Sequence, residues 1–581
     1  MIDESLTTLS TLTPAQITEA MASDSDDGEE QELPDPDYEN LLDYFPKKPR
    51  DNQVQILQEI QKGLLDPNIK FILVDSPTGT GKSVLAISAG RASGSAYQST
   101  SNKALQDQYE RDFPEYLATL KGRANYKCLR HPIDGETYVT RPPAEGFNCG
   151  NAPCRSVKRF KKTCSGLTHG GKLLGPLCEY SQALNKAAQS PLVSFNSAAL
   201  MAFINHTSKF DKRNLIVLDE CHGIGSAITN FVELTLSGQS LEDVEIQDLP
   251  DYSAPEDYDG FVDQVFTATV AVLRPLIAKD ELDEYEQRRM EKLEAMLKKL
   301  MVYRTINKRG ENEPSNMAVE KIYHQQNKRL DKVTFKPVKV DKIAHEYLFQ
   351  YADKIIMMSA TLNFDIMLQT LGIPLEQAQC IRVSSPFPKE NRPIYRNYVG
   401  RLNYKNIEQL TPRLIEAIRA IMTHHGDQKG IIHGVSYKLC KALNEGLRGT
   451  DRILFPSSSA EQRDVLDAHF KTKNPTVLLS PSMTEGIDLV GDLSRFQILV
   501  KMPYPSLGDP LVQQRMLLYQ SYYAVQTGLT LVQAYGRSVR SATDSCITYI
   551  LDGQFESFLQ QNENVLPPWF VEAIVGYKTK R

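Results

Sequence analysis

Short runs of apolar residues recur along the chain, and segments of helical character separate them. The first run, Phe71–Val74, precedes a helical segment that extends from Gly81 to Ala89. Further runs cover residues 215–218, 355–358, 430–433, 477–479 and 498–500. Strands that are apolar at every position are typical of parallel sheets with helices on both faces. Their alternation with helices predicts an α/β protein with parallel sheets.

Three stretches depart from this pattern. Residues 126–182 are rich in cysteine, glycine and basic side chains, and residues 226–345 include a highly charged helical segment, Glu281–Leu300. We interpret both as insertions into the first α/β domain. Residues 1–38 are polar and acidic with little apolar periodicity, which predicts a disordered tail. The tail is a candidate contact for a protein partner, with a purely solubilising role as the alternative.

The length and net charge of the chain limit the classes of protein to which it can belong. The chain has 581 residues, enough for roughly three to five domains. Its 66 Lys and Arg residues and 72 Asp and Glu residues give a net charge of −6, so a nucleic-acid surface would be a local basic stripe. We find no apolar run of ~18 residues and no signal-peptide start, so no membrane span is expected. The expected location is the cytoplasm of the cell that makes the chain.

The first apolar run leads into a glycine-containing loop and then a helix. This is the order of a P-loop, in which backbone N–H groups surround a phosphate at a helix N-terminus. Lys82 is expected to reach the β- and γ-phosphates of ATP, and Ser83 to bind Mg²⁺. A serine, Ser76, replaces the usual first glycine. The expected phosphate-binding residues are Ser76, Pro77, Thr78, Gly79, Thr80, Gly81, Lys82 and Ser83.

A pair of carboxylates follows the second apolar run. Leu215–Leu218 ends at Asp219-Glu220-Cys221-His222, and the carboxyl end of a parallel strand faces the crevice in which ligands bind. We expect Asp219 to hold Mg²⁺ and Glu220 to deprotonate the attacking water.

Two arginines and a glutamine near the C-terminus have helical spacing. Gln533, Arg537 and Arg540 stand at positions i, i+4 and i+7, which would place them on one face of a helix. Arginine stabilises the charge that spreads over γ-phosphate oxygens during hydrolysis. These residues are therefore predicted to complete the ATP site from a second domain, with a solvated basic face as the alternative.

Five cysteines lie between residues 128 and 178: Cys128, Cys149, Cys154, Cys164 and Cys178. Core packing does not explain such clustering, and four thiolates can bind zinc or an iron–sulfur cluster. Zinc sites usually contain two close pairs of cysteines, whereas only Cys149 and Cys154 are close here. The number of cysteines alone does not decide between the two metals.

Several segments, taken in order, resemble the DEAH-type helicases of superfamily 2, and more narrowly the branch that contains XPD and bacterial DinG. Besides the P-loop and the acidic motif, they are residues 48–53, 99–108, 121–128, 359–362, 385–387, 484–488 and 533–540. The resemblance covers about residues 44–556. Asp-Glu-Cys-His stands where the family has Asp-Glu-Ala-His.

The resemblance implies a fold and a set of ligands. It predicts two RecA-like motor domains, the first formed by residues 39–125, 183–225 and 346–375 and the second by 376–581. The first would carry an iron–sulfur insertion at 126–182 and a mainly helical, arch-like insertion at 226–345. Arg50 and Gln53 would lie on the adenine side, and Gly486 and Asp488 would also contact ATP. A [4Fe–4S] cluster is favoured over zinc, with Cys128, Cys154 and Cys178 as ligands and Cys149 or Cys164 as the fourth.

The implied activity is that of an ATP-dependent DNA helicase that moves 5′ to 3′. Single-stranded and forked DNA are the expected partners, and we expect a monomer with a bacterial or phage role in repair or replication. Two alternatives stay open at this point. One is an RNA helicase or ribonucleoprotein remodeller, and the other is a nucleic-acid-binding regulator that ATP switches.

Overall fold

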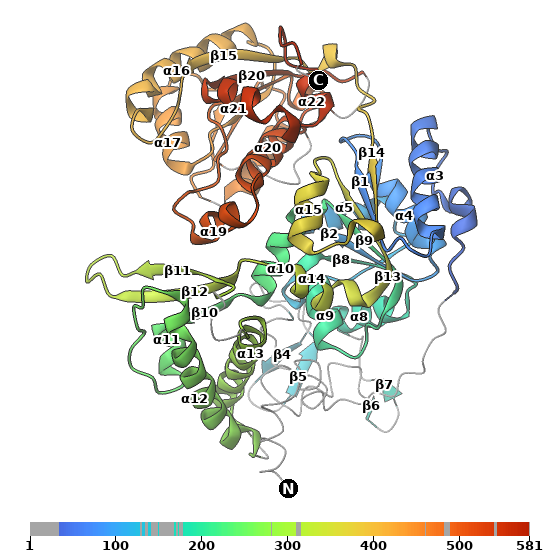
Figure 1. The fold of residues 1–581 in the computed structure, drawn as a ribbon, viewed down its shortest axis with the longest axis vertical. Coiled ribbons are helices and arrows are strands. Elements are labelled where there is room, and N and C mark those ends of the chain that lie inside the picture. The colour runs from blue at the N-terminus through green and yellow to red at the C-terminus, as the bar shows by residue number, and fades with distance from the viewer. Residues whose placement is uncertain are drawn as a thin grey trace.

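The computed structural model describes residues 34–127, 130–133, 137–140, 149, 168–169, 172–173, 178–279, 282–308, 315–458, 461–481, 489–539 and 543–579. Figure 1 shows two α/β domains, one above the other in this view, with a further group of helices and strands beside the lower one. The lower domain contains the P-loop, and we call it motor domain 1. The upper one, motor domain 2, contains the C-terminal part of the chain.

The sheet of motor domain 1 is parallel, with the strand order β14-β1-β13-β9-β2-β8-β3. Its strands are β1 (Phe71–Asp75), β2 (Ala96–Thr100), β3 (Ala118–Thr119), β8 (Leu192–Asn196), β9 (Arg213–Asp219), β13 (Ala352–Ser359) and β14 (Ala378–Arg382). Every residue of β1 is buried, as expected for a strand covered on both faces. The parallel α/β fold is therefore confirmed.

Helices cover both faces of this sheet because alternate side chains of each strand point to opposite sides. Phe71 and Leu73 join one hydrophobic core, and Ile72 and Val74 join the other. One core is closed by α8 (Glu179–Gln189), α9 (Ser197–His206), α10 (Ile224–Val232), α14 (Asp341–Tyr347) and α15 (Phe364–Leu371). The other is closed by α3 (Asp51–Leu65), α4 (Lys82–Ala92) and α5 (Lys103–Asp112).

The predicted end of motor domain 1, after residue 375, is wrong. The strand β14 comes later in the chain and pairs along its length with β1, from Ala378 opposite Phe71 to Arg382 opposite Asp75. A short mixed-polarity strand at the edge of a sheet lacks the continuous apolar run that identified the others, which explains why the sequence did not reveal it. Motor domain 1 therefore extends at least to Arg382.

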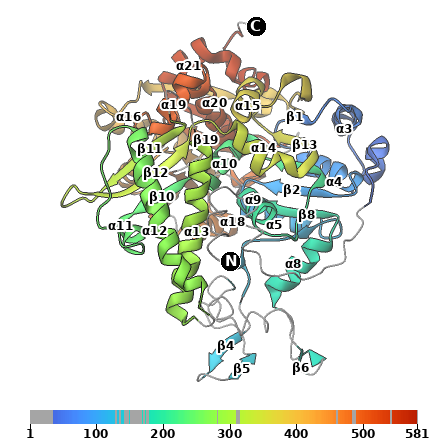
Figure 2. The same cartoon turned by 60° about the horizontal axis from the view of Figure 1, so that its bottom comes forward.

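The second insertion forms a separate unit, the arch, beside motor domain 1 (Figure 2). It contains α11 (Gly238–Glu242), α12 (Asp259–Ile277) and α13 (Glu284–Ile306). It also contains an antiparallel sheet of order β10-β12-β11, formed by β10 (Leu234–Ser237), β11 (Met317–Tyr323) and β12 (Leu330–Pro337). The arch is mainly helical, as expected, and it also contains a three-stranded sheet that the sequence did not predict.

One helix of the described chain, Pro255–Ile277, is long and apolar enough by length and composition to cross a membrane, although our inspection of the sequence found no such stretch. Its apolar side chains, including Val262 and Val265, pack in the core of the arch. Leu273 and Leu276 pack with residues of α13 in a second cluster. Packing within the arch thus accounts for the apolar character of this helix.

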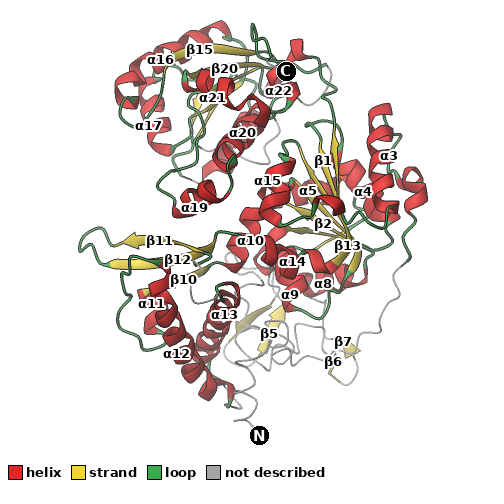
Figure 3. Ribbon diagram, in the orientation of Figure 1, coloured by secondary structure: helices red, strands yellow, loops and turns green. Residues whose placement is uncertain are grey.

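Motor domain 2 has a parallel sheet of order β15-β20-β19-β16-β18-β17. Its strands are β15 (Ile394–Gly400), β16 (Gly430–His433), β17 (Ile453–Leu454), β18 (Val477–Ser480), β19 (Phe496–Leu499) and β20 (Ile547–Asp552). Helices cover this sheet as well (Figure 3), namely α16 (Ile407–His424), α17 (Tyr437–Gly446), α18 (Gln462–Lys471), α19 (Pro510–Leu518), α20 (Tyr522–Tyr535), α21 (Gln554–Asn562) and α22 (Pro568–Val571).

The helix α19 connects motor domain 2 to the arch. Its buried Arg515 donates hydrogen bonds to the backbone oxygens of Val338, through Nε at 3.0 Å, and of Pro337, through Nη2 at 3.3 Å. Nη2 also bonds Oγ1 of Thr229 in α10, at 2.9 Å. One side chain therefore joins motor domain 2, the end of the arch sheet and a helix of motor domain 1.

Candidate ATP site and cysteine insertion

The glycines of the P-loop have backbone conformations that other residues rarely adopt. It connects β1 to α4, and its glycines Gly79 and Gly81 have φ values of +79° and +90°, a region that favours glycine. Ser76, the departure from the usual motif, is buried, and its hydroxyl lies 2.6 Å from Oγ1 of Thr80. Thr80 Oγ1 in turn donates to the carbonyl of Pro77 at 2.8 Å. The serine is thus accommodated by a hydrogen bond inside the loop.

Arg50 and Gln53, predicted on the adenine side, contact the P-loop directly. Arg50 Nη2 donates to the carbonyl oxygen of Gly79 at 3.1 Å, and Gln53 Nε2 donates to that of Thr80 at 3.0 Å. A Cβ atom on Gly81 would lie 2.2 Å from Gln53 Nε2. The structure therefore brings both residues to the nucleotide loop, while contact with adenine stays a prediction.

The two carboxylates of the acidic motif lie at the end of β9, opposite Lys82. Lys82 Nζ is 3.8 Å from Glu220 Oε1 and 3.2 Å from the carbonyl oxygen of Ser76. Glu220 has a φ of +52°, and its backbone N–H donates to Asp219 Oδ1 at 3.0 Å. Left-handed backbone in a non-glycine residue is uncommon and tends to occur at functional sites. Here the turn directs the two carboxylates toward the P-loop lysine.

Burial and the neighbouring charges move the pKa values of the two carboxylates in opposite directions. Burial, followed by the charge of Glu220, raises the pKa of Asp219 to about 6. Burial also raises the pKa of Glu220, but the positive charge of Lys82 and contacts with His222 outweigh it and hold that pKa below its usual value. Glu220 therefore stays ionised at neutral pH, as a general base must.

The third strand end at the site belongs to residues 359–362. The hydroxyl of Ser359 lies 2.9 Å from His222 Nδ1 and donates to Glu220 Oε2 at 3.4 Å. The carbonyl oxygen of Ser359 accepts the backbone N–H of Ser76 at 2.9 Å. This segment, which resembles the family's coupling motif, thus contacts both the P-loop and the acidic motif. The role of His222 was not predicted from the sequence.

Tyr109 is a further contact that the sequence did not predict. It follows the segment 99–108 on α5 and is buried, and its hydroxyl donates to Asp219 Oδ2 at 2.7 Å. Burial, together with the charge of Asp219, raises the pKa of Tyr109 well above its ordinary value. The hydroxyl therefore remains a donor to the predicted Mg²⁺ ligand. An isolated tyrosine within a polar helix gives no sequence signal for such a role.

Motor domain 2 faces the acidic motif across a cleft of about 330 Å³. Gln533 of α20 lines this cleft together with Asp219, Glu220 and His222. The predicted helical stripe is wrong for Arg537, because α20 ends at Tyr535. The next residue is Gly536, and glycine weakens a helix.

Arg537 still lies near the site. Its positive charge contributes to lowering the pKa of Glu220 and that of His433. Its carbonyl oxygen accepts the backbone N–H of Leu489 at 3.2 Å, which fixes the turn after α20. From motor domain 2, Gln533 thus lines the cleft beside the acidic motif, and the charge of Arg537 acts on Glu220 from the turn after α20.

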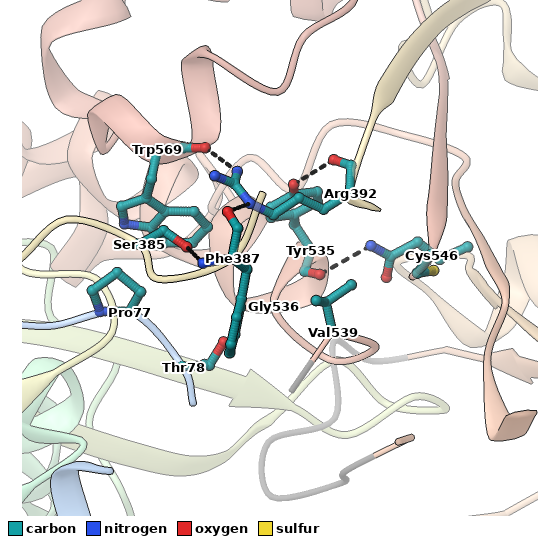
Figure 4. A pocket seen from close by; sticks show the side chains of 11 residues that line it. Pro77, Thr78, Ser385, Phe387, Arg392, Tyr535, Gly536, Val539, Cys546 and Trp569 are labelled. Atoms are coloured by element: carbon teal, nitrogen blue, oxygen red, sulfur yellow. Dashed lines mark hydrogen bonds between the residues drawn. The ribbon is translucent and has the colours of Figure 1, made fainter. Parts of the chain in front are cut away.

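The outer face of the P-loop also meets motor domain 2 (Figure 4). Pro77 and Thr78 line a cavity of about 20 Å³ with Tyr535 and Gly536, too little space for more than about one water molecule. The buried Arg392 organises the far wall, since it donates to the carbonyl oxygens of Phe387, at 3.2 Å, and of Trp569. The P-loop is therefore in close contact with motor domain 2.

Parts of the cysteine insertion converge on one place. The backbone N–H of Cys149 donates to the carbonyl oxygen of Tyr126 at 2.8 Å, and the rings of Tyr126 and Tyr180 are 5.6 Å apart. Tyr126 precedes Cys128 by two residues, and Tyr180 follows Cys178 by two. Cys149 and the residues that flank Cys128 and Cys178 therefore lie close together.

The described part of the insertion is otherwise two hairpins, β4 (Arg130–Ile133) with β5 (Thr137–Thr140) and β6 (Thr168–His169) with β7 (Lys172–Leu173). Among the described residues, no group of three or more His, Cys, Asp or Glu side chains could hold a metal ion. Some predicted site residues lie outside the described part of the chain, namely Cys128, Cys154, Cys164, Gly486, Asp488 and Arg540.

The fold and the site together define a P-loop motor with two parallel α/β domains and a nucleotide site between them. Residues 419–573 match the family of helicase C-terminal domains. The chain is similar to ATP-dependent DNA helicase YoaA of Escherichia coli strain K12, with 24% identity over 88% of this chain and 92% of that protein. YoaA of Haemophilus influenzae is 22% identical over 89% of this chain and 94% of its own length.

Solved structures give the same fold. An XPD helicase aligns with 89% of this chain and 98% of its own, with a TM-score of 0.58 and 15% identity. Xpd4 of S. tokodaii aligns with 90% of this chain and 99% of its own, with a TM-score of 0.54 and 14% identity. These similarities confirm the resemblance to XPD/DinG-like helicases that the motifs indicated.

Proposed function

We propose that this chain is an ATP-dependent DNA helicase that moves 5′ to 3′ along single-stranded DNA and unwinds forked duplexes. The observation that carries the proposal is the position of Glu220. It lies 3.8 Å from the P-loop lysine and bonds the Ser359 hydroxyl, and it lines the cleft that Gln533 borders from motor domain 2. The similarity to YoaA helicases over most of the chain supports DNA as the substrate.

In this proposal each side chain has a defined task in hydrolysis. Lys82 binds the β- and γ-phosphates, and Glu220 accepts a proton from the attacking water. Ser83 and Asp219 would hold Mg²⁺, which neutralises phosphate charge when bound. Gln533, Arg537 and Arg540 stabilise the γ-phosphate from motor domain 2. Separation of the domains removes that contact, so hydrolysis is coupled to domain movement.

The motor proposal is tested first with Lys82→Ala. The wild-type protein should hydrolyse ATP much faster with single-stranded DNA than without it, and the variant should lose this stimulated turnover. Retention of stimulated turnover would contradict the motor.

Single-stranded RNA of the same sequence is the competing activator, and stronger stimulation by RNA would favour an RNA helicase. A duplex with a single 5′ or 3′ tail then reports direction, with unwinding expected only from the 5′ tail.

The cysteine insertion is proposed to hold a [4Fe–4S] cluster. The contact between Cys149 and Tyr126 supports Cys149 over Cys164 as the ligand beside Cys128, Cys154 and Cys178. Protein purified without air should contain about four irons with matching sulfide per chain. Cys149→Ser should lose that iron and Cys164→Ser, its matched control, should keep it. One zinc without iron would overturn the cluster, and the reverse result for the two variants would overturn the ligand choice.

We also propose a protein contact, an oligomeric state and a location for the whole protein. The acidic segment 1–38 binds a protein partner, and the active unit is a monomer in the cytoplasm of a bacterium or a phage-infected host. Light scattering of the protein with and without forked DNA tests the monomer. Pull-down with the isolated tail against the tail-deleted protein tests the partner.

A further inference from the structure

The helix α5 joins the predicted strand-binding segment to the ATP site. It begins with Asn102 as its N-cap, whose side chain accepts the N–H of Leu105 at 3.0 Å. Its first residues belong to the segment 99–108 that resembles the family's strand-binding motif. Tyr109 lies one to two turns further along the helix. Its hydroxyl donates to Asp219 at the ATP site. The same short helix therefore carries both functions.

Asp219 receives a hydrogen bond on each carboxylate oxygen. Oδ1 accepts the backbone N–H of Glu220 at 3.0 Å, and Oδ2 accepts the Tyr109 hydroxyl at 2.7 Å. A hydroxyl that donates to a carboxylate forms a charge-assisted bond, stronger than one between neutral groups. Two donors on different oxygens fix the plane of the carboxylate and leave the other lone pairs for Mg²⁺ or its water. Glu220 supplies its donor from the same strand end, whereas Tyr109 supplies one from a separate helix.

The helix α5 is itself held to the sheet by directed bonds. Gln106, fully buried, donates through Nε2 to the carbonyl oxygens of Leu120, at 3.0 Å, and Ser194, at 2.9 Å. The Tyr109 ring packs against Phe113 with 5.9 Å between centroids. Residues 103–108 and Tyr109 belong to one short, continuous helix, so a displacement of its N-terminal end moves the Tyr109 hydroxyl as well.

We propose that Tyr109 is a positioning residue that orients Asp219 for Mg²⁺ and couples DNA engagement at residues 99–108 to metal–nucleotide binding. The proposal rests on the helicase function proposed above. The Tyr109 hydroxyl would thus link DNA binding to metal–nucleotide binding. Because coupling between two binding sites is reciprocal, metal–nucleotide binding should also strengthen DNA binding through the same link.

The test is Tyr109→Phe, which keeps the ring and removes only the hydroxyl. The matched control is Tyr97→Phe, since Tyr97 is also buried and its hydroxyl donates to the carbonyl oxygen of Asp211, also at 2.7 Å. Electron paramagnetic resonance measures the affinity of Mn²⁺, used as a probe for Mg²⁺, in the presence of a non-hydrolysable ATP analogue. Each protein is titrated with and without a single-stranded oligonucleotide.

In the wild type, the oligonucleotide should tighten Mn²⁺ binding. Tyr109→Phe should weaken Mn²⁺ binding about 10-fold, the lower range found when a partner of a metal ligand is removed, and should lose most of the tightening by DNA. Tyr97→Phe should behave like the wild type. Unchanged Mn²⁺ affinity in Tyr109→Phe would overturn the proposal, and weakened affinity with full DNA coupling would overturn the link through α5. A wild type without DNA-stimulated ATPase would instead contradict the helicase function itself.

Discussion

Replacement of Glu220 by Gln should separate ATP binding from ATP hydrolysis. The amide keeps the shape of the side chain but cannot accept a proton from water, and loss of a positioned general base costs about 10²–10⁴-fold in rate. The DNA-stimulated kcat should therefore fall by at least about 100-fold, or ~3 kcal/mol in the barrier. Because the pKa of Glu220 lies below its usual value, Glu220 stays ionised near neutral pH, and its titration should not change the wild-type rate there.

The same substitution should tighten nucleotide binding. In the nucleotide-free protein, Glu220 attracts Lys82 across 3.8 Å, and its charge repels an incoming phosphate. Two charges about 4 Å apart near a protein surface interact with ~4 kcal/mol before further screening. The Glu220 side chain is 28% exposed, so only part of this energy should appear. We expect Glu220→Gln to bind ATP a few-fold to about 10-fold more tightly.

Stopped-flow binding of a fluorescent ATP analogue and phosphate release with single-stranded DNA measure the two effects. Glu556→Gln is a matched control in motor domain 2, since Glu556 is 34% exposed and pairs with Arg396 at 3.0 Å. Its kcat and nucleotide affinity should both stay within about twofold of the wild type. Near-normal turnover in Glu220→Gln would exclude Glu220 as the base. Weaker ATP binding in that variant would show that Glu220 does not compete with phosphate for Lys82.

Three further predictions concern the P-loop, the arch and pH. Gly81→Ala should raise the KM for ATP at least about 10-fold, because the φ of +90° disfavours a side chain and the new Cβ would meet Gln53 2.2 Å away. Gly238→Ala, with no atom within 4 Å of the new Cβ, is the control, and equal effects would refute the steric argument. Arg515→Met should destabilise the protein by about 3 kcal/mol, since three oxygens lose a charged donor; an unchanged melting temperature would contradict this. Burial raises the pKa of Asp75 to about 6 despite its pairing with Arg382. A group with a raised folded-state pKa favours the folded protein as pH falls from about 6 toward 4, by at most about 3 kcal/mol, so the melting temperature of Asp75→Asn relative to the wild type should fall over that range; a parallel pH profile would refute it.

The sequence predicted those parts of the site that depend on local spacing. Lys82, Asp219 and Glu220 follow apolar strands directly, and a parallel sheet necessarily brings the ends of its strands to one edge. Gln533 lies within α20, as its helical spacing predicted. Arg537 lies outside the helix, which ends at Tyr535, because a periodic pattern in the sequence does not show where a helix ends.

Contacts between distant segments could not be predicted in the same way. Tyr109 reaches Asp219 only because β2, which precedes α5, pairs with β9 in the sheet, and no spacing along the chain encodes that neighbour. The strand β14 was missed because its residues, Ala378–Arg382, are of mixed polarity and lie at a sheet edge. Arg515 likewise acquires its partners from the arch and from α10, which become neighbours only after folding.

The hydrogen bonds of Arg515 connect the two motor domains to the arch, so they provide a route by which ATP hydrolysis would move the arch. The helix α10 begins at Ile224, two residues after His222, so it follows the acidic motif directly, and its Thr229 accepts a bond from Arg515. The other acceptors, Pro337 and Val338, lie at the end of the arch strand β12 and just after it. A change in the separation of the motor domains must therefore move α10 and the arch together with α19, or break these bonds. If the bonds persist through the cycle, Arg515→Met should reduce the number of base pairs unwound per ATP while leaving DNA-stimulated hydrolysis within a few-fold of normal. If both fall in proportion, Arg515 serves stability alone and the arch moves independently of α19.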